Sequence, residues 1–427
     1  MQINGRAVAL NQVFYGWWVL AGLIFIYTAS NGILIATLPV LYPSMMAEFG
    51  WTAAQMTLPA TLFLLASAVL SPFGGVLLDR QPPRIVMAVG IAIMLAGLVV
   101  LPAITALWQV SVIFVAFAFG LAAGGLLPSM VILTRWFVRN RGVAAGLLLM
   151  SSSLGGALFP LLIRDALTDE GWRSAVYLMT VAGGAMMILP LVWLVRGDPR
   201  DKGLVADGDA APVDAARAPT AIAQVATLRD AVRSADFYLL AFATGVLWFC
   251  FIGVLQHQSI YLGRDLGVSS ETLPLVFSVF FWFAMIGKAL FGVLSDWFKK
   301  THIMLLAIVN LGVGLILLRL IDADTPGLIY VYAAVYGAGY SGAFTMIQLM
   351  IAEFFAGPSY GKILGLFVMI DTLAGALGTR VLGDLRDGLG SYAPAFNLMI
   401  ALCVIAGACV LVLDRRQASA APLPQKG

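Results

Sequence analysis

The sequence contains twelve apolar runs, each long enough to cross a lipid bilayer as a helix. About 20 residues at a rise of ~1.5 Å each span the hydrocarbon layer. Within that layer each backbone polar group needs a partner inside the protein, so runs of this length form helices. The runs are 15–43, 54–78, 85–105, 109–134, 142–163, 174–195, 236–259, 271–294, 303–321, 328–350, 362–383 and 391–412. The chain is therefore predicted to be an all-α membrane protein.

The composition supports this class and excludes others. Hydrophobic residues make up 61% of the chain and charged residues only 11%, whereas soluble domains carry about 25% charged residues. The net charge of +3 does not indicate nucleic-acid binding, because the basic residues lie in short loops. The three cysteines lie in apolar runs without metal-binding or disulfide spacing. We expect no metal, no cofactor and no nucleic-acid partner.

The runs divide into two sets of six. We predict an N-terminal six-helix bundle over 1–196, a cytoplasmic linker over 197–235, a C-terminal bundle over 236–413 and a cytoplasmic tail over 414–427. The linker is rich in Ala, Asp and Pro, and 227–234 is predicted to form a short amphipathic helix. Similar stretches end the second and eighth runs, Gly-Val-Leu-Leu-Asp79 and Gly-Val-Leu-Ser-Asp296. Such copies predict two pseudo-symmetric bundles.

The distribution of basic residues predicts the orientation. With both termini in the cytoplasm, about 18 of the 25 Lys and Arg residues lie on the inner side. The expected location is a cell membrane crossed many times, with both termini cytoplasmic, in a bacterial inner membrane.

One lysine, Lys288, stands inside the eighth run. A lysine near mid-membrane costs roughly 2.5–3.5 kcal/mol on insertion scales, so it is expected to be functional and to have a partner. Eight residues separate it from Asp296, which is roughly 12 Å along a helix. Asp371 in the eleventh run lies nine residues after Lys362, roughly 13 Å along its helix. The two charges are at nearly equal depth and can pair if their helices face each other.

Two interpretations of such a pair remain open. In the functional one, protonation of Asp371 frees Lys288 to bind a substrate carboxylate, and loss of the proton closes the pair and expels the substrate. In the structural one, a static ion pair orients the two helices.

Four further residues are candidates. His257 is a proton relay at the outer mouth or a polar helix cap. Arg380 is an outer gate or a snorkelling arginine at the membrane interface. Asn31 and Tyr336 line the cavity and bind substrate, or they tie one helix to another.

The end of the second run resembles the signature loop of the major facilitator superfamily. The matching residues are Gly74-Gly75-Val-Leu-Leu-Asp79-Arg80 with Arg84, although Gln81-Pro82-Pro83 stands where the family often has glycine. The resemblance covers the whole chain. It implies that Asp79 and Arg80, with Asp296 in the second copy, form a latch between the halves in one conformation.

Within the superfamily the chain is most similar to the branch of oxalate/formate antiporters and monocarboxylate transporters. The motifs are Tyr15-Gly16-Trp17-Trp18, Glu48-Phe49-Gly50-Trp51, Thr134-Arg135-Trp136-Phe137 with Arg141-Gly142, Gly171-Trp172-Arg173 and Gly357-Pro358. In that branch a basic residue at the position of Lys288 is implicated in binding carboxylate. Asp371 stands where the oxalate exchanger has a lysine, and Ala284 where animal monocarboxylate carriers have an aspartate.

We therefore expect a secondary transporter rather than an enzyme, since no catalytic constellation and no phosphate-binding loop is present. The expected substrate is a small organic anion of the monocarboxylate type, moved by alternating access in a monomer, with proton symport. Exchange, or antiport, stays open. One alternative is a proton-driven efflux pump for a drug or metabolite. Another, of a different class, is a ligand receptor that does not transport.

Overall fold

The computed structural model describes residues 14–208, 228–322, 325–355, 357 and 359–420, without the side chains of 71–76, 79 and 418–420. Across these residues the structure is helical, with no strand. The predicted all-α fold is confirmed. Residues 209–227 of the linker and 421–427 of the tail lie outside the described residues, so the domain boundaries stay predictions.

The first half of the chain forms six spans, three of which consist of more than one helical element. They are α1 (Tyr15–Asn31) with η2 (Gly32–Thr37), η3 (Leu38–Leu41) and α2 (Tyr42–Phe49); α3 (Ala53–Arg80); α4 (Pro83–Val100) with η4 (Leu101–Ala103); α5 (Leu107–Gly124) with α6 (Leu126–Trp136); α7 (Arg141–Asp169); and α8 (Trp172–Trp193).

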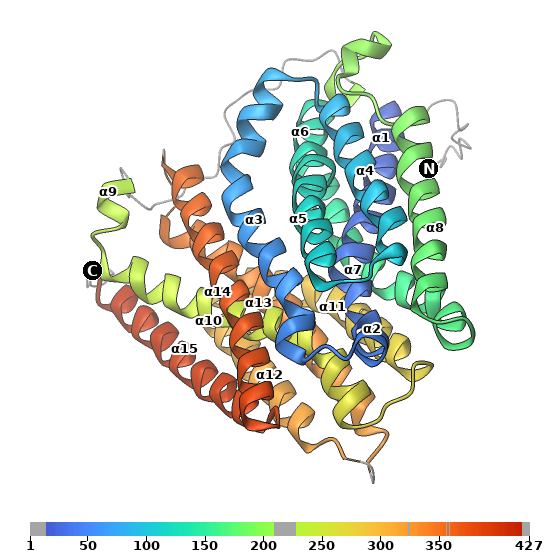
Figure 1. Cartoon of the computed structure of the whole chain (residues 1–427). Coiled ribbons are helices and arrows are strands. Elements are labelled where there is room, and N and C mark those ends of the chain that lie inside the picture. The colour runs from blue at the N-terminus through green and yellow to red at the C-terminus, as the bar shows by residue number, and fades with distance from the viewer. Residues whose placement is uncertain (1–13, 209–227, 323–324, 356, 358, 421–427) are drawn as a thin grey trace, which may run out of the picture.

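The second half also forms six spans, after three short linker helices. The linker helices are η5 (Pro199–Lys202), η6 (Ala206–Gly208) and α9 (Leu228–Ala231), and the spans are α10 (Ala235–Ile260) with η7 (Tyr261–Asp265), α11 (Thr272–Trp297), α12 (Lys300–Leu320), α13 (Leu328–Phe355), α14 (Tyr360–Leu389) and α15 (Ala393–Ala420). Figure 1 shows the first half on the right and most of the second at lower left.

Eleven of these spans in the described chain are long and apolar enough to cross a membrane. The remaining predicted span, 328–350, forms α13, which has the right length of 28 residues. Its hydropathy is lower because tyrosines and glycines recur along it, among them Tyr332, Tyr336 and Tyr340. These polar groups point to a helix buried among other helices rather than one facing lipid.

Local sequence explains where the spans end and where they cross closely. Gly50 ends α2 with a φ of 70°, a conformation that glycine adopts without strain. Thr52 and Gln55 then start α3 with a capping box. Where η2 crosses α7, a Cβ on Gly32 would lie 2.6 Å from the backbone of Gly155. Glycine is therefore required there, because the two helix backbones approach closely.

The predicted amphipathic helix over 227–234 is shorter in the structure. The described part is the single turn α9, Leu228–Ala231. Ser234 instead caps the next helix, because its hydroxyl accepts a hydrogen bond of 3.2 Å from the N–H of Phe237.

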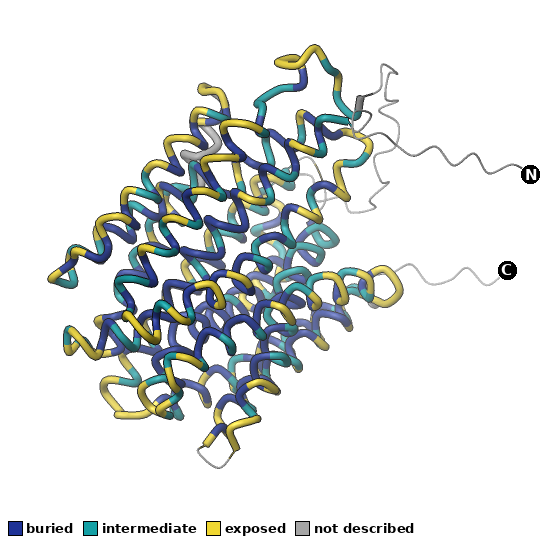
Figure 2. Tube along the Cα trace, turned by 90° about the vertical axis from the view of Figure 1, so that its right-hand side faces the viewer, coloured by how far each residue is buried: buried dark blue, intermediate teal, exposed yellow. Residues whose placement is uncertain are grey.

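The outer surface of the helices is apolar. Figure 2 shows exposed residues along the outward faces and buried ones inside. Val181 and Val404 are 72% and 70% exposed, which suits side chains that meet lipid rather than water.

The two halves pack together mainly through α7 against α11 and α3 against α14. We call the end where α3 and α11 begin, marked by Ala53 and Glu271, the closed end. We call the opposite end, marked by Arg80 and Asp296, the linker end.

Candidate functional site

Lys288 joins the two halves. It lies half-buried on α11, and its ammonium group donates hydrogen bonds to Ser152 Oγ at 2.8 Å and to the Leu149 carbonyl at 3.2 Å, both on α7. Its Nζ also lies 5.8 Å from the centre of the Phe344 ring on α13. All of these partners are uncharged, so a substrate anion would not have to displace a carboxylate.

Asp371 does not pair with Lys288 in this conformation, contrary to the interpretation as an ion pair. It lies on α14 and is 2% exposed, beside the Thr244 side chain on α10. Its Oδ1 atom is buried and has no hydrogen-bond partner. The equal depth of the two residues does not bring them into contact, because their helices have different neighbours. Helix α14 packs on α10 and α3, while α11 packs on α13 and α7.

A pair of tyrosines, Tyr27 and Tyr340, continues from Ser152, which accepts a hydrogen bond from Lys288. The Tyr27 hydroxyl on α1 lies next to the Ser152 hydroxyl and near Tyr340 on α13. Asn31 is half-buried and lies one helical turn beyond Tyr27, on the same face of the span. Sequence reasoning missed Ser152, although the three serines 151–153 in an apolar run are a visible signal.

Tyr336 does not line this site, contrary to the substrate-binding interpretation. It is completely buried, and its hydroxyl donates a hydrogen bond of 3.1 Å to the Cys250 carbonyl on α10. Tyr332, one turn earlier, donates similarly to Gln258 Oε1 at 2.7 Å. Both tyrosines tie α13 to α10, which was the second interpretation.

His257 lies inside the second half, not at an outer mouth. It is 1% exposed; its Nε2 lies 2.8 Å from the Thr379 carbonyl, and its Nδ1 lies 2.7 Å from the Tyr392 hydroxyl. A carbonyl only accepts, so Nε2 carries the hydrogen and neutral His257 accepts from Tyr392 through Nδ1. The side chain thus links α10 to α14 and α15, and it neither relays protons at a mouth nor caps a helix.

Arg380 is not placed to act as a gate. It is exposed and pairs with Asp384, one turn along its own helix, at 2.7 Å. The contacts between the halves at the closed end come from other residues. Arg164 at the end of α7 bonds both the side chain and the carbonyl of Glu271.

Asp387 makes a second contact between the halves at the closed end. Its carboxylate accepts hydrogen bonds from the N–H groups of Ala53 at 3.1 Å and Ala54 at 2.9 Å, the first two residues of α3. A carboxylate at a helix N-terminus is favoured by the helix dipole. Nothing in the sequence singled out Asp387 among its charged neighbours.

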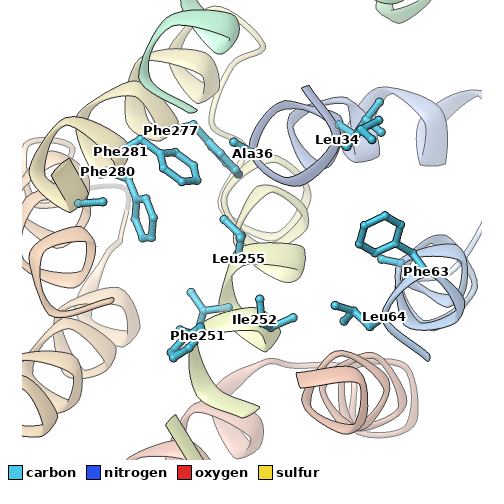
Figure 3. Packing of buried hydrophobic residues seen from close by; sticks show 14 of the residues in the cluster. Leu34, Ala36, Phe63, Leu64, Phe251, Ile252, Leu255, Phe277, Phe280 and Phe281 are labelled. Carbon is cyan, nitrogen blue, oxygen red and sulfur yellow. The ribbon is translucent and has the colours of Figure 1, made fainter. Parts of the chain in front are cut away.

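An apolar seal lies between the closed end and Lys288. Figure 3 shows residues of both halves meeting there, each at most 7% exposed: Leu34, Ala36, Phe63, Leu64, Phe251, Ile252, Leu255, Phe277, Phe280 and Phe281. Beside it, the Ser278 hydroxyl donates to the Ala157 carbonyl at 2.8 Å. Gly156 lies so close to Phe281 that a Cβ would approach its ring within 2.4 Å.

The residues predicted as a latch lie apart from this seal. Arg80 and Asp296 are exposed at the linker end, and neither bonds a described residue. The side chain of Asp79 lies outside the described residues. The inter-half hydrogen bonds given above all lie between the closed end and Lys288, and among the described side chains Arg80 and Asp296 are not engaged in this conformation.

Comparisons with known proteins agree with the fold. A family model described as Major Facilitator Superfamily matches residues 20–262 and 237–427. The chain is 24% identical to the phosphoglycerate transporter protein of Salmonella typhimurium, over 97% of this chain and 92% of that protein. It is 26% identical to monocarboxylate transporter 13 of Bos taurus, over 93% and 89%.

A solved structure has the same architecture. It is the crystal structure of a bacterial homologue of the human lysosomal transporter Spinster, in an inward-facing and unoccupied conformation. It matches with a TM-score of 0.67 and 18% identity, over 96% of this chain and 99% of that chain. The predicted architecture of two six-helix bundles is confirmed.

Proposed function

Because the chain belongs to the major facilitator superfamily of membrane transporters, we propose that it carries a small organic monoanion, binding its carboxylate at Lys288. The observation that carries this proposal is the position of the ammonium group. It lies between the halves, at the inner edge of their contact, and bonds only uncharged groups. A carboxylate can replace the Ser152 and Leu149 oxygens, because it adds the attraction between opposite charges to the hydrogen bonds of the ammonium group.

The number of positively charged side chains near the site favours a substrate with a single negative charge. The helices around Lys288 are α1, α7, α10 and α13. Apart from Arg141, the first residue of α7, their one Arg or Lys is Arg164, which bonds Glu271 at the closed end. A phosphate-bearing acid or a dicarboxylate would leave at least one charge without a partner in an apolar interior, which is costly. The name of the phosphoglycerate transporter is therefore a weaker guide to the substrate than that of monocarboxylate transporter 13.

Alternating access follows from where the contacts lie. We place the closed end outside the cell and both termini in the cytoplasm of a bacterium, as the basic loops indicate. In the conformation described, the site then communicates with the cytoplasm. Rocking of the two bundles, within one monomer, would break the Arg164 and Asp387 contacts and engage Asp79, Arg80 and Asp296 as the inner latch.

Asp371 is the proposed proton carrier, although not through a direct pair with Lys288. A buried carboxylate without a partner for Oδ1 is unfavourable as an anion, and a proton relieves that cost. When the bundles rock, α14 moves relative to α3, which changes the surroundings of Asp371. Proton uptake and release would then accompany movement of the anion.

Transport by purified protein in proteoliposomes tests both the substrate site at Lys288 and the proton carrier Asp371. With an imposed pH gradient, labelled monocarboxylates should accumulate, and Lys288→Ala should abolish their uptake while Lys288→Arg retains part of it. Asp371→Asn should keep exchange of internal for external anion but lose accumulation driven by the gradient. Undiminished uptake by Lys288→Ala would refute the substrate site. Undiminished accumulation by Asp371→Asn would refute only the proton carrier.

A further inference from the structure

A row of aromatic side chains extends from Lys288 into the interior of the second half. The Phe344 ring lies 5.8 Å from Lys288 Nζ. The Trp248 ring on α10 lies 6.2 Å from Phe344, and Phe251 is a further 5.0 Å from Trp248. Tyr340 packs edge-on against Phe251 at 5.0 Å. A row of four aromatic rings thus begins 5.8 Å from the Lys288 ammonium group.

Two of these aromatic residues, Trp248 and Phe344, differ in exposure from those of the seal. Phe251, Phe280 and Phe281 are at most 3% exposed, and Figure 3 shows them packed among apolar neighbours. Phe344, which lies beside Lys288, and Trp248, which lies beside Phe344, stay partly exposed by contrast. A partly exposed ring next to an inter-half cation borders space that a ligand can enter, whereas a fully buried ring only fills the interior.

The indole of Trp248 adds a hydrogen-bond donor. Its Nε1 atom is buried and has no acceptor among the described residues. An indole N–H usually finds a partner when it is buried, and leaving it unpaired is unfavourable. An oxygen on a bound molecule would satisfy it.

Resting on the proposed function, we infer that the substrate is an aromatic monocarboxylate. Its carboxylate binds Lys288, its ring lies against Phe344, and Trp248 donates to an oxygen substituent on the far side of the ring. A short acid such as formate or acetate would leave the rings uncovered. A polyol or sugar acid would bring hydroxyls against apolar walls that offer few acceptors.

Competition in proteoliposomes tests this inference with defined probes. Phenylacetate should inhibit uptake of labelled acetate at a concentration at least ten-fold below that needed with unlabelled acetate. Phe344→Leu should raise the KM for phenylacetate about five-fold more than the KM for acetate. Phe354→Leu, the same change near the linker end of α13, is the matched control and should alter neither value.

The indole donor is tested by a pair of ring acids. Trp248→Phe keeps a ring but loses the N–H, so it should raise the KM for 4-hydroxyphenylacetate about five-fold and spare phenylacetate. Thermal unfolding of each variant shows whether it is folded.

The two proposals fail separately. If acetate uptake depends on Lys288 but phenylacetate does not compete, or Phe344→Leu changes both acids equally, the aromatic substrate is refuted and the anion site stands. If Trp248→Phe changes the KM for both ring acids equally, the indole donor is refuted. If no carboxylate is taken up, the proposed function itself fails.

Discussion

Removal of the Asp387 carboxylate should shift the protein toward the conformation in which the closed end is open. Asp387 bonds the N–H groups of Ala53 and Ala54 across the interface between the halves. The N-terminus of α3 also has its own cap from Thr52, which stays in either conformation. Asp387→Ala therefore destabilises only the closed arrangement. In the open arrangement the halves are separated, and water can bond the N–H groups of Ala53 and Ala54 with or without Asp387.

The size of the shift follows from helix capping. Replacing a capping carboxylate by alanine costs about 1 kcal/mol, which multiplies the population of the open arrangement about five-fold. Asp387→Asn keeps an oxygen acceptor and should give a smaller shift. Asp384→Ala is the matched control, since Asp384 pairs only with Arg380 on its own helix.

Labelling of a single cysteine measures the shift. Ser278 is 3% exposed and donates across the interface to Ala157, so a cysteine there is reached from outside only when the halves part. We would introduce Ser278→Cys after replacing the three native cysteines, and follow its reaction with a membrane-impermeant maleimide. Labelling should be about five-fold faster in Asp387→Ala. An unchanged rate, or an equal rise in Asp384→Ala, would refute the reasoning.

Two further predictions concern stability and pH. Gly155→Leu should markedly lower the thermal unfolding temperature of the detergent-solubilised protein, because a Cβ at Gly155 would lie 2.0 Å from the Thr28 carbonyl; Gly146→Leu, with nothing within 4 Å, should have little effect, and equal losses would contradict this. His257→Phe leaves the buried Tyr392 hydroxyl without its partner and should lower stability by about 1–3 kcal/mol. The pH profile of transport should keep its midpoint, and a displaced midpoint would show that His257 takes part in proton movement.

The sequence predicted the number of helices, their approximate bounds and their division into two sets. This was feasible because a backbone in lipid must satisfy its own hydrogen bonds, so a run of about 20 apolar residues has few alternatives to a helix. The sequence also singled out Lys288 as a candidate site residue, because a charge inside such a run stands out from its neighbours. The depth of Lys288 and Asp371 could be counted along their helices.

The partners of these side chains were decided only by the tertiary structure. Lys288 bonds α7 instead of Asp371, and Asp387 rather than Arg380 joins the halves at the closed end. Tyr336 and His257 turn into the second half, away from the site. In a soluble helix the polar face would have revealed its rotation. Here the lipid-facing and protein-facing sides are both apolar, so the sequence fixes how deep a residue lies but not the direction in which it points.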